Sequence, residues 1–417
     1  MRNIFSSFGV KFAFVLMYVV SNIWAAFDII DKDSLIGDHA GWPAPSVFEI
    51  LVALGFVIAV YIGILFLVKE KKNCTITYPA VIQSKTLSLA ILAIQAIFFA
   101  FVVIFSAGAA GGDMDKAGGG LRFLFYLVNP DMLFIIFYAA TMLVPGNVKY
   151  RKANLILFFV SNLVRGWIGQ TLVIVFLLAI NWVRTSGQEI SGKKLLSLTF
   201  FGFIFFVLAS FLMHIKIALR LGGDAIVEIL GNLSFYEVMS TFFETLFSRL
   251  QLLSTVSFQI TKKAELSRFI DEGIIGNFYT DGLPQQTIYK ILGIDPGENL
   301  NLFLWKYYIP GDFFEAQTTV QPGFVGWLYL LSMPSVIIFL CYMAALIYIN
   351  LRLIRKIGGN GLRYLSWFSI MLYLVPGWLG AYISFLWSLM IFLMIVSFIH
   401  DQRVVSTIVR KMQVDAG

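Results

Sequence analysis

Two arginines and a group of acidic residues are the side chains of this chain with the clearest capacity for chemistry. Arg165 lies inside a long apolar segment, where a charged side chain is costly and by default faces a polar cavity or a charged partner. Arg249 lies beside a stripe of polar residues that recur at steps of three or four. Guanidinium groups bind anions through paired hydrogen bonds, and a carboxylate can accept a proton from a hydroxyl group.

The polar stripe belongs to an amphipathic helix that we expect over residues 234–260. Its members share one face of that helix: Glu237, Thr241, Glu244, Ser248, Gln251 and Thr255. The other residues are mostly Phe, Leu, Val and Met, which form an apolar surface wide enough to lie in or on a membrane. A helix with acids and Arg249 on its polar face and an apolar surface opposite suits a lipid-linked, sugar-bearing substrate. A solvated face on a packed helix explains the same pattern equally well.

Arg165 and Arg122 both lie in apolar surroundings, and each has a structural as well as a functional interpretation. Arg165 can serve a site, or it can reach the lipid headgroups as an anchor. Arg122 opens a predicted span that is interrupted at residues 129–131 (Asn-Pro-Asp). The proline there frees a backbone carbonyl that can meet a ligand, although a kink with a satisfied Asp131 carboxylate is the favoured interpretation.

A histidine and two pairs of aspartates complete the candidates. His214 ends a predicted span at its outer side, with Arg220 further along, and is either a base or a structural residue. Two Asp-x-Asp patterns in predicted outer loops can hold a divalent cation: Asp31/Asp33 and Asp113/Asp115. Such short patterns arise by chance in acidic loops, so we predict no metal site.

The composition places these residues in a membrane protein. The chain has 417 residues, of which 59% are hydrophobic and only 13% are charged. Its mean hydropathy is +0.83, and no water-soluble fold of this length has that balance. The net charge of +7 comes from basic residues at predicted helix ends, so no nucleic acid partner is expected. Residues 1–27 resemble a signal peptide, and we interpret them as a retained first span.

Apolar segments that mark membrane crossings fall at about 12–27, 46–68, 86–108, 121–144, 153–183, 195–215, 321–350 and 364–399. Segment 153–183 would make about 46 Å of helix, which is too long for one crossing of a core of about 30 Å and short for two. Basic loops flank it on both sides, so the positive-inside rule requires an even number of crossings. We therefore expect a hairpin that turns near Arg165-Gly166-Trp167. The same argument predicts a hairpin in 364–399, which carries Pro376-Gly377 near its middle.

With these hairpins the chain makes about ten crossings, and both termini are cytoplasmic. Most Lys and Arg then lie inside, and most Asp and Glu lie outside. The predicted fold is an all-α, polytopic membrane helix bundle in three parts. These are an N-terminal bundle at 1–215, a large helical extracytoplasmic loop at 216–320, and C-terminal helices with a cytoplasmic tail at 321–417. No matching broken helices occur in two halves of the sequence, which argues against a secondary transporter.

Three short patterns resemble the O-antigen polymerases, bacterial membrane enzymes that join oligosaccharide repeat units. Residues 317–329 (QTTVQPGFVGWLY) resemble the segment that closes the large periplasmic loop of that family. Residues 248–251 (SRLQ) resemble the Arg-bearing start of the loop, and Arg165-Gly166 is similar to a third pattern. Chain length, span number and the single late external insert also agree with the family.

The resemblance implies an inverting glycosyltransferase of the GT-C type in the bacterial inner membrane. Its substrates would be undecaprenyl-diphosphate-linked glycans, its partners membrane lipid and a chain-length regulator, and it would need no cofactor. The residues then expected to act in catalysis are Arg249, Arg165, Glu237, Glu244 and His214, and those expected to bind diphosphate or sugar are Arg122, Arg220, Arg268 and Gln251. An O-antigen ligase would share this fold and chemistry, and a lipid-linked oligosaccharide flippase is a further alternative.

Overall fold

The computed structural model describes residues 7–68, 76–105, 124–125, 127–144, 148–165, 169–185, 207, 210–211, 234–309 and 320–415. Regular structure within these residues is helical, and extended pairing is limited to isolated bridges. The all-α class is therefore confirmed. Five of the described helices are long and apolar enough to cross a membrane: α1 (Ser7–Lys32), α2 (Val47–Leu67), α4 (Lys85–Phe105), α17 (Met333–Ile357) and α19 (Leu379–Asp415).

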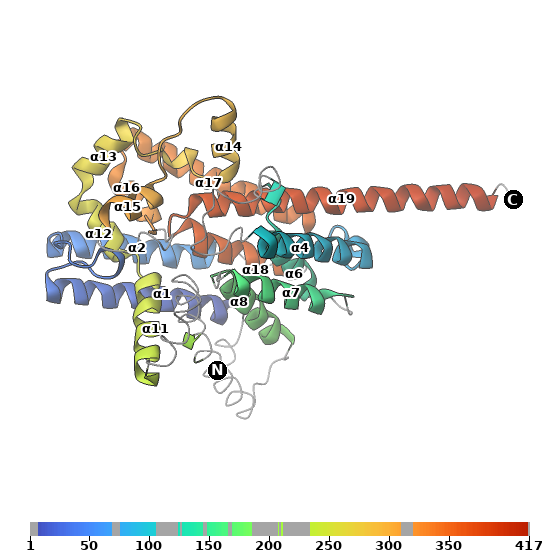
Figure 1. Ribbon diagram of the computed structural model, residues 1–417, viewed down its shortest axis with the longest axis horizontal. Helices are drawn as coiled ribbons and strands as arrows, with labels where there is room; N and C mark the ends of the chain where they lie inside the picture. The colour runs from blue at the N-terminus through green and yellow to red at the C-terminus, as the bar shows by residue number, and fades with distance from the viewer. Residues whose placement is uncertain are drawn as a thin grey trace.

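Most of the long helices run along a common direction, with shorter helices packed between them (Figure 1). The shorter ones are α3 (Pro79–Ile82), α6 (Pro130–Met142), α7 (Arg151–Val164), α8 (Gly169–Thr185) and α18 (Asn360–Ser369), which continues as the π-helical turn η4 (Ile370–Leu374). Helix α6 is the centre of this bundle, because all of its residues are buried and it contacts α3, α4, α7, α8, α18 and α19. A helix that is apolar on all sides is typical of such an enclosed position.

Described residues next to the basic loops meet at one end of the bundle. The Nζ of Lys11, near the start of α1, donates to the Val68 carbonyl at the end of α2 (3.2 Å). The amide of Thr77 donates to the Ile357 carbonyl (3.0 Å), and the Arg184 guanidinium lies 5.2 Å from the centre of the Tyr364 ring. Described residues that flank the loops assigned to the cytoplasm therefore lie together, and we call this the basic end.

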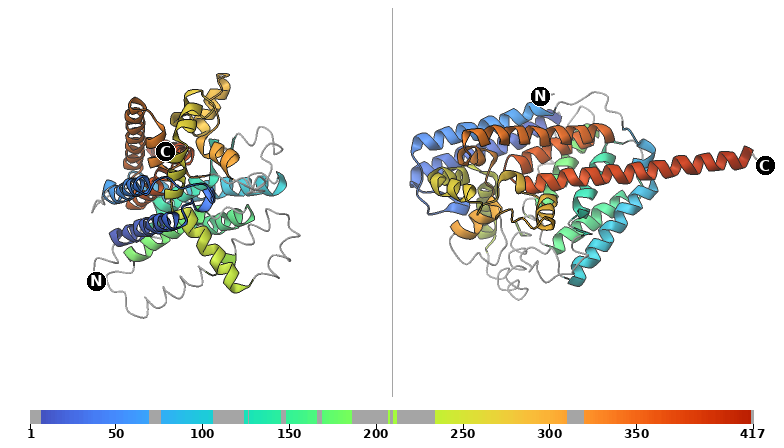
Figure 2. Two further views of the ribbon diagram at one scale, coloured as in Figure 1. Left: turned by 90° about the vertical axis from the view of Figure 1, so that its left-hand side faces the viewer. Right: turned by 90° about the horizontal axis from the view of Figure 1, so that it is seen from above.

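The described helices of the insert gather at the opposite end, which we call the insert end (Figures 1 and 2). They are α11 (Phe235–Leu250), α12 (Leu253–Thr261), α13 (Lys263–Asp271), η2 (Phe278–Thr280), α14 (Leu283–Ile291) and α15 (Leu300–Tyr308), joined by α16 (Phe324–Leu330). The loop between α1 and α2, with its 3-10 turn η1 (Gly37–His39), is seated among them. Trp42 of that loop donates its indole N–H to the Tyr308 carbonyl (3.0 Å).

The prediction of one continuous helix over 234–260 is wrong. It is divided into α11 and α12 at Gln251 and Leu252. The Asn22 side chain of α1 accepts the backbone N–H groups of Leu252 and Leu253 at 2.8 and 3.0 Å. In a continuous helix these two amides would donate to backbone carbonyls of the preceding turn, and here Asn22 accepts them instead. The polar stripe therefore shares one helix face only within α11. Segment 321–350 is likewise divided, because α16 ends before α17 begins with Pro334 in its first turn.

The two long apolar segments are interrupted where the sequence predicted reversals. Helix α7 ends at Val164 and α8 begins at Gly169. In the second segment, the Pro376 carbonyl accepts the Gly323 amide at the insert end (2.9 Å). Further along α19, the His400 ring contacts Tyr78 near the basic end (5.3 Å between ring centres). Gly377 makes the turn with φ of +81°, and a Cβ there would lie 2.7 Å from the Gly323 amide nitrogen, so only glycine fits.

Candidate functional site

The first candidate site is an ion pair enclosed by the helical bundle, here called the buried pair. The Nη2 of Arg165 donates to Oδ2 of Asp131, and the two side chains are only 7% and 5% exposed. The Nε of Arg165 donates to the Ser161 carbonyl of the same helix (3.3 Å). The face of the guanidinium lies over Phe98 of α4, with 4.8 Å between Cζ and the ring centre. Such a cation over an aromatic face is stabilised further when it is desolvated.

Helix ends favour both charges of the buried pair. Asp131 lies in the first turn of α6, where the Asn129 side chain caps the helix by accepting the Met132 amide (3.1 Å). Arg165 is the C-cap residue of α7. Anions are stabilised at helix N-termini and cations at C-termini, so each charge is also stabilised by its own helix. The interpretation of Asp131 as a satisfied carboxylate beside a proline agrees with this geometry, and Arg165 is its partner.

Three irregular points of the backbone meet at the buried pair. They are the start of α6 after Asn129, the end of α7 at Val164, and the π-helical turn η4. Tyr373 of η4 is buried and lies close enough to Asp131 for their charges to interact. Irregular backbone inside a membrane bundle is tolerated where protein or a cavity surrounds it, and π turns are frequent at functional sites.

The second candidate site is an ion pair at the insert end, here called the surface pair. The Nη1 of Arg249, in the last turn of α11, lies 3.2 Å from Oδ2 of Asp38 in η1, and the side chains are 37% and 26% exposed. The loop that carries Asp38 is fixed by Ser254, whose hydroxyl donates to the Ile36 carbonyl (2.6 Å) and accepts the Ile36 amide (3.2 Å). Arg249 is thus held in a defined place and still reaches solvent.

Helix α11 runs across the long helices rather than along them (Figures 1 and 2). It packs on α1 and η1, with Phe247 and Trp24 in ring contact at 5.7 Å. Large apolar side chains on it are exposed, with Phe235 at 57%, Tyr236 at 79% and Phe243 at 44%. A helix that lies across membrane helices and exposes such residues is typical of the membrane–water interface. Arg249 lies in the last turn of this helix.

The two acids of α11, Glu237 and Glu244, are on the helix that carries Arg249 and not on the helices around Arg165. Glu237 is exposed and forms a capping box with Ser234, whose amide donates to the carboxylate (2.8 Å). This bond from the Ser234 backbone, with that from its hydroxyl, lowers the pKa of Glu237. Glu244 is also exposed. The described residues thus bring Arg249, Glu237 and Glu244 onto one helix, whereas Arg165 lies among α4, α6 and α7.

Two predicted binding residues have local structural partners. Gln251 is buried, and its Oε1 accepts the Ser254 amide at the start of α12 (2.9 Å). Arg268 is exposed and lies 3.7 Å from Glu272 one turn along α13. Asp31 and Asp33 are exposed at the end of α1, and the described residues contain no cluster of three metal-type ligands. The other predicted site residues lie outside the described residues: His214, Arg122, Arg220, Asp113 and Asp115.

Sequence reasoning missed two titratable residues at the insert end. His39 is fully buried with its ring stacked on Phe258 (4.1 Å between centres), and burial lowers its pKa to about 3. Asp281 accepts backbone N–H groups of Gly380 and Gly282, yet burial raises its pKa to about 6. Neither residue belongs to a motif, and only the packing of distant segments creates their surroundings.

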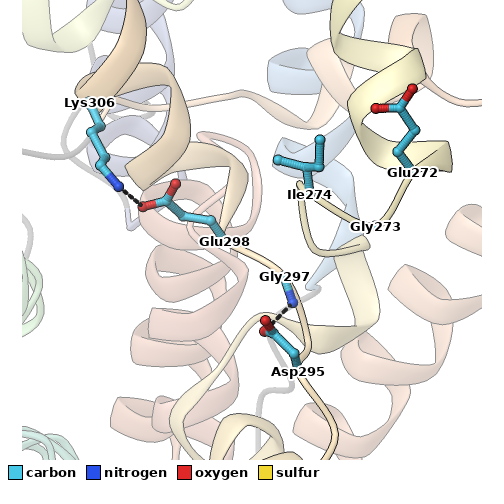
Figure 3. A pocket seen from close by; sticks show the side chains of 7 residues that line it. All are labelled: Glu272, Gly273, Ile274, Asp295, Gly297, Glu298 and Lys306. Carbon is cyan, nitrogen blue, oxygen red and sulfur yellow. Dashed lines mark hydrogen bonds and ion pairs between the residues drawn. The ribbon is translucent and has the colours of Figure 1, made fainter.

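A shallow hollow of about 530 Å³ lies on the insert, rimmed by Glu272, Asp295, Glu298 and Lys306 (Figure 3). The charged side chains of this hollow bond to neighbouring residues of the insert. Glu298 lies 3.3 Å from Lys306, and Asp295 accepts the Gly297 amide (3.0 Å). None of its lining residues belongs to the buried pair or the surface pair, so we interpret this stretch as ordinary surface.

No protein family model, curated protein or solved structure matches this chain. The chemistry assigned to it therefore rests on the geometry of the buried pair, the surface pair and α11.

Proposed function

We propose that this protein is a membrane glycosyltransferase that polymerises oligosaccharide repeat units carried on undecaprenyl diphosphate. The observation that carries this proposal is α11, which combines exposed apolar side chains, the partly exposed Arg249 and two exposed carboxylates on one helix. A lipid-linked diphosphate sugar has its apolar chain in the membrane, its diphosphate at the interface and its glycan in water. Helix α11 offers an apolar face, a cation and polar side chains at matching levels.

The membrane placement proposed is that of about ten crossings in the bacterial inner membrane, with the insert facing the outer leaflet. In support of this placement, described residues that flank the basic loops lie together at one end of the bundle, and the described insert helices lie at the other. The membrane potential and the lipid charge favour basic loops inside. Lipid-linked donors presented at the outer leaflet would then meet α11 directly.

The reaction proposed is an inverting displacement at the anomeric carbon of the growing chain. A hydroxyl oxygen of the incoming repeat unit forms a bond to that carbon while the bond from the carbon to the diphosphate oxygen breaks. Undecaprenyl diphosphate leaves with the bonding electron pair, and the hydroxyl proton passes to a carboxylate or imidazole base. The new glycosidic bond lengthens the polymer by one unit without any oxidant or nucleotide.

Arg249 and Arg165, which lie in separate sites, are the two candidates for stabilising the negative charge that develops on the leaving diphosphate. Planar guanidinium groups are suited to it because they donate paired bonds to phosphate oxygens. Glu244, Glu237 and His214 are the candidate bases. The capping hydrogen bonds from Ser234 lower the pKa of Glu237, which makes this carboxylate a poorer proton acceptor.

Deletion of the gene, followed by gel analysis of surface polysaccharide, tests this proposal. Loss of the ladder with a single repeat unit on the lipid core is the result expected for a polymerase. A bare core with polymer retained on undecaprenyl diphosphate would instead assign a ligase, which shares this chemistry. An unchanged ladder would contradict both. Complementation with the wild-type chain, at matched protein level in the membrane, is the control for each outcome.

A further inference from the structure

The buried pair lies at a depth where an unpaired charge is costly. Helix α7 begins at Arg151, whose Nη1 donates to the Thr141 carbonyl near the basic end (3.0 Å), and has 14 residues. Because α7 rises at most about 21 Å from Arg151, the proposed topology puts Arg165 inside a hydrocarbon core of about 30 Å. A guanidinium at that depth needs an anion, so the chain must supply one whenever no ligand does.

Arg165 keeps its place without Asp131. Its Nε donates to the Ser161 carbonyl, and its face rests on the Phe98 ring. These contacts come from α7 itself and from α4, and neither involves the carboxylate. Among the described residues, none accepts a hydrogen bond from Nη1. The guanidinium therefore remains oriented if Oδ2 of Asp131 gives way to another anion.

Asp131 also keeps partners without Arg165. The Nδ2 of Asn162 donates to Oδ1 of Asp131 (3.3 Å) and is itself held on the Phe158 carbonyl (2.9 Å). The carboxylate further lies in the first turn of α6, where the helix dipole favours negative charge. Each member of the buried pair thus has a second set of stabilising contacts that does not involve the other member.

We propose that Asp131 is the resident counter-ion of Arg165, replaced by the diphosphate of the lipid carrier when that ligand binds. This inference rests on the proposed function, because it takes undecaprenyl diphosphate as the ligand. Exchange of anions keeps the charge of Arg165 neutralised in both states. It also limits the affinity for diphosphate, since the ligand must displace a carboxylate that already occupies the cation. That limit lets undecaprenyl diphosphate leave after transfer.

Counter-ion exchange and a structural ion pair predict opposite effects of removing the carboxylate. If Asp131 competes with the ligand, its loss tightens diphosphate binding and slows release of the product. If the pair only holds helices together, loss of Asp131 leaves a buried unpaired charge and destabilises the protein without tightening binding. The sign of the change in affinity therefore separates the two.

The experiment measures the Kd of undecaprenyl diphosphate for the full chain in lipid nanodiscs. We expect Asp131→Asn to bind about tenfold more tightly, which corresponds to about 1.4 kcal/mol, with slower turnover and stronger product inhibition. Asp131→Glu keeps the charge and is expected to bind close to wild type. Arg165→Gln is expected to bind about tenfold more weakly or worse. Equal or weaker binding by Asp131→Asn overturns the inference.

Asn154→Ala is the matched control, because it removes a buried polar contact from the same helix. The Nε2 of Gln95 donates to Oδ1 of Asn154 (2.7 Å), between α4 and α7. This variant is expected to unfold at lower temperature while its folded molecules bind undecaprenyl diphosphate as wild type does. A gain in affinity here would mean that loosening α7, rather than freeing Arg165, tightens binding, and would also overturn the inference.

A measurement on the wild-type chain removes any dependence on the folding of Asp131→Asn. Infrared difference spectra with guanidino-labelled arginine report a change of partner from carboxylate to phosphate when undecaprenyl diphosphate is added. The band assigned to Arg165, by its absence in Arg165→Lys, is expected to shift together with a carboxylate band. Binding without these shifts overturns the counter-ion role alone. If wild type does not bind undecaprenyl diphosphate, the proposed function fails with it.

Discussion

Asn22 of α1 and Leu252 of the insert are joined by a short hydrogen bond across 230 positions of sequence. The Oδ1 of Asn22 accepts the Leu252 amide at 2.8 Å and the Leu253 amide at 3.0 Å, while its Nδ2 donates to the Tyr18 carbonyl (2.8 Å). Asn22 is fully buried. This one side chain therefore fixes both the break between α11 and α12 and the place where the insert meets the bundle.

We expect Asn22→Leu to lower the free energy of unfolding by about 2 kcal/mol, because two buried amides lose their acceptor. Thermal unfolding in detergent measures the change. Ser21→Ala is the neighbouring control, since its hydroxyl only bonds the Met17 carbonyl within α1 (2.9 Å), and it should change little. Equal stability of the two variants would show that Asn22 does not hold the insert.

Gly377 provides a second test of how the insert end is joined. Its φ of +81° and the 2.7 Å approach to the Gly323 amide leave no room for a Cβ. We expect Gly377→Ala to destabilise the protein by about 2 kcal/mol or more, from left-handed strain and displacement of the neighbouring turn. A Cβ added at Gly55 in α2 would have no neighbouring atom within 4 Å, so Gly55→Ala should be neutral or stabilising. A Gly377→Ala variant as stable as wild type in the same unfolding assay would contradict this geometry.

The sequence predicts the parts of this structure that depend on local chemistry. Apolar length and charge placement predicted the helical class and interruptions at Arg165 and at Pro376-Gly377. The break at Gln251 escaped prediction because its cause, Asn22, lies far away in sequence. Arg165 and Asp131 were each noted alone, but their pairing across 34 positions follows only from the packing of α6 on α7.

Arg249 is the residue whose replacement tests the proposed site at the interface. We expect Arg249→Ala to reduce chain elongation by about 100-fold or more, because a donor to the developing diphosphate charge is lost. Arg249→Lys should be intermediate, since an ammonium group keeps the charge without the paired donors. Polysaccharide ladders at matched protein level measure the effect. Lys32→Ala, which removes an exposed cation paired with Asp28, should leave the ladder intact. A full ladder from Arg249→Ala would remove Arg249 from the site.

The free energy of unfolding depends on pH through Asp281. Burial raises its pKa from 3.8 to about 6 in the folded state, so the folded protein binds an extra proton between these values. Stability from this group is therefore fully present below pH 3.8 and is lost as the pH rises through 6, by up to about 3 kcal/mol. Asp281→Asn keeps an acceptor for the Gly380 amide and never ionises. We expect its melting temperature to exceed that of wild type at pH 8, and the difference to close at pH 4. A constant difference across this range would show that the Asp281 carboxyl does not titrate in the window stated.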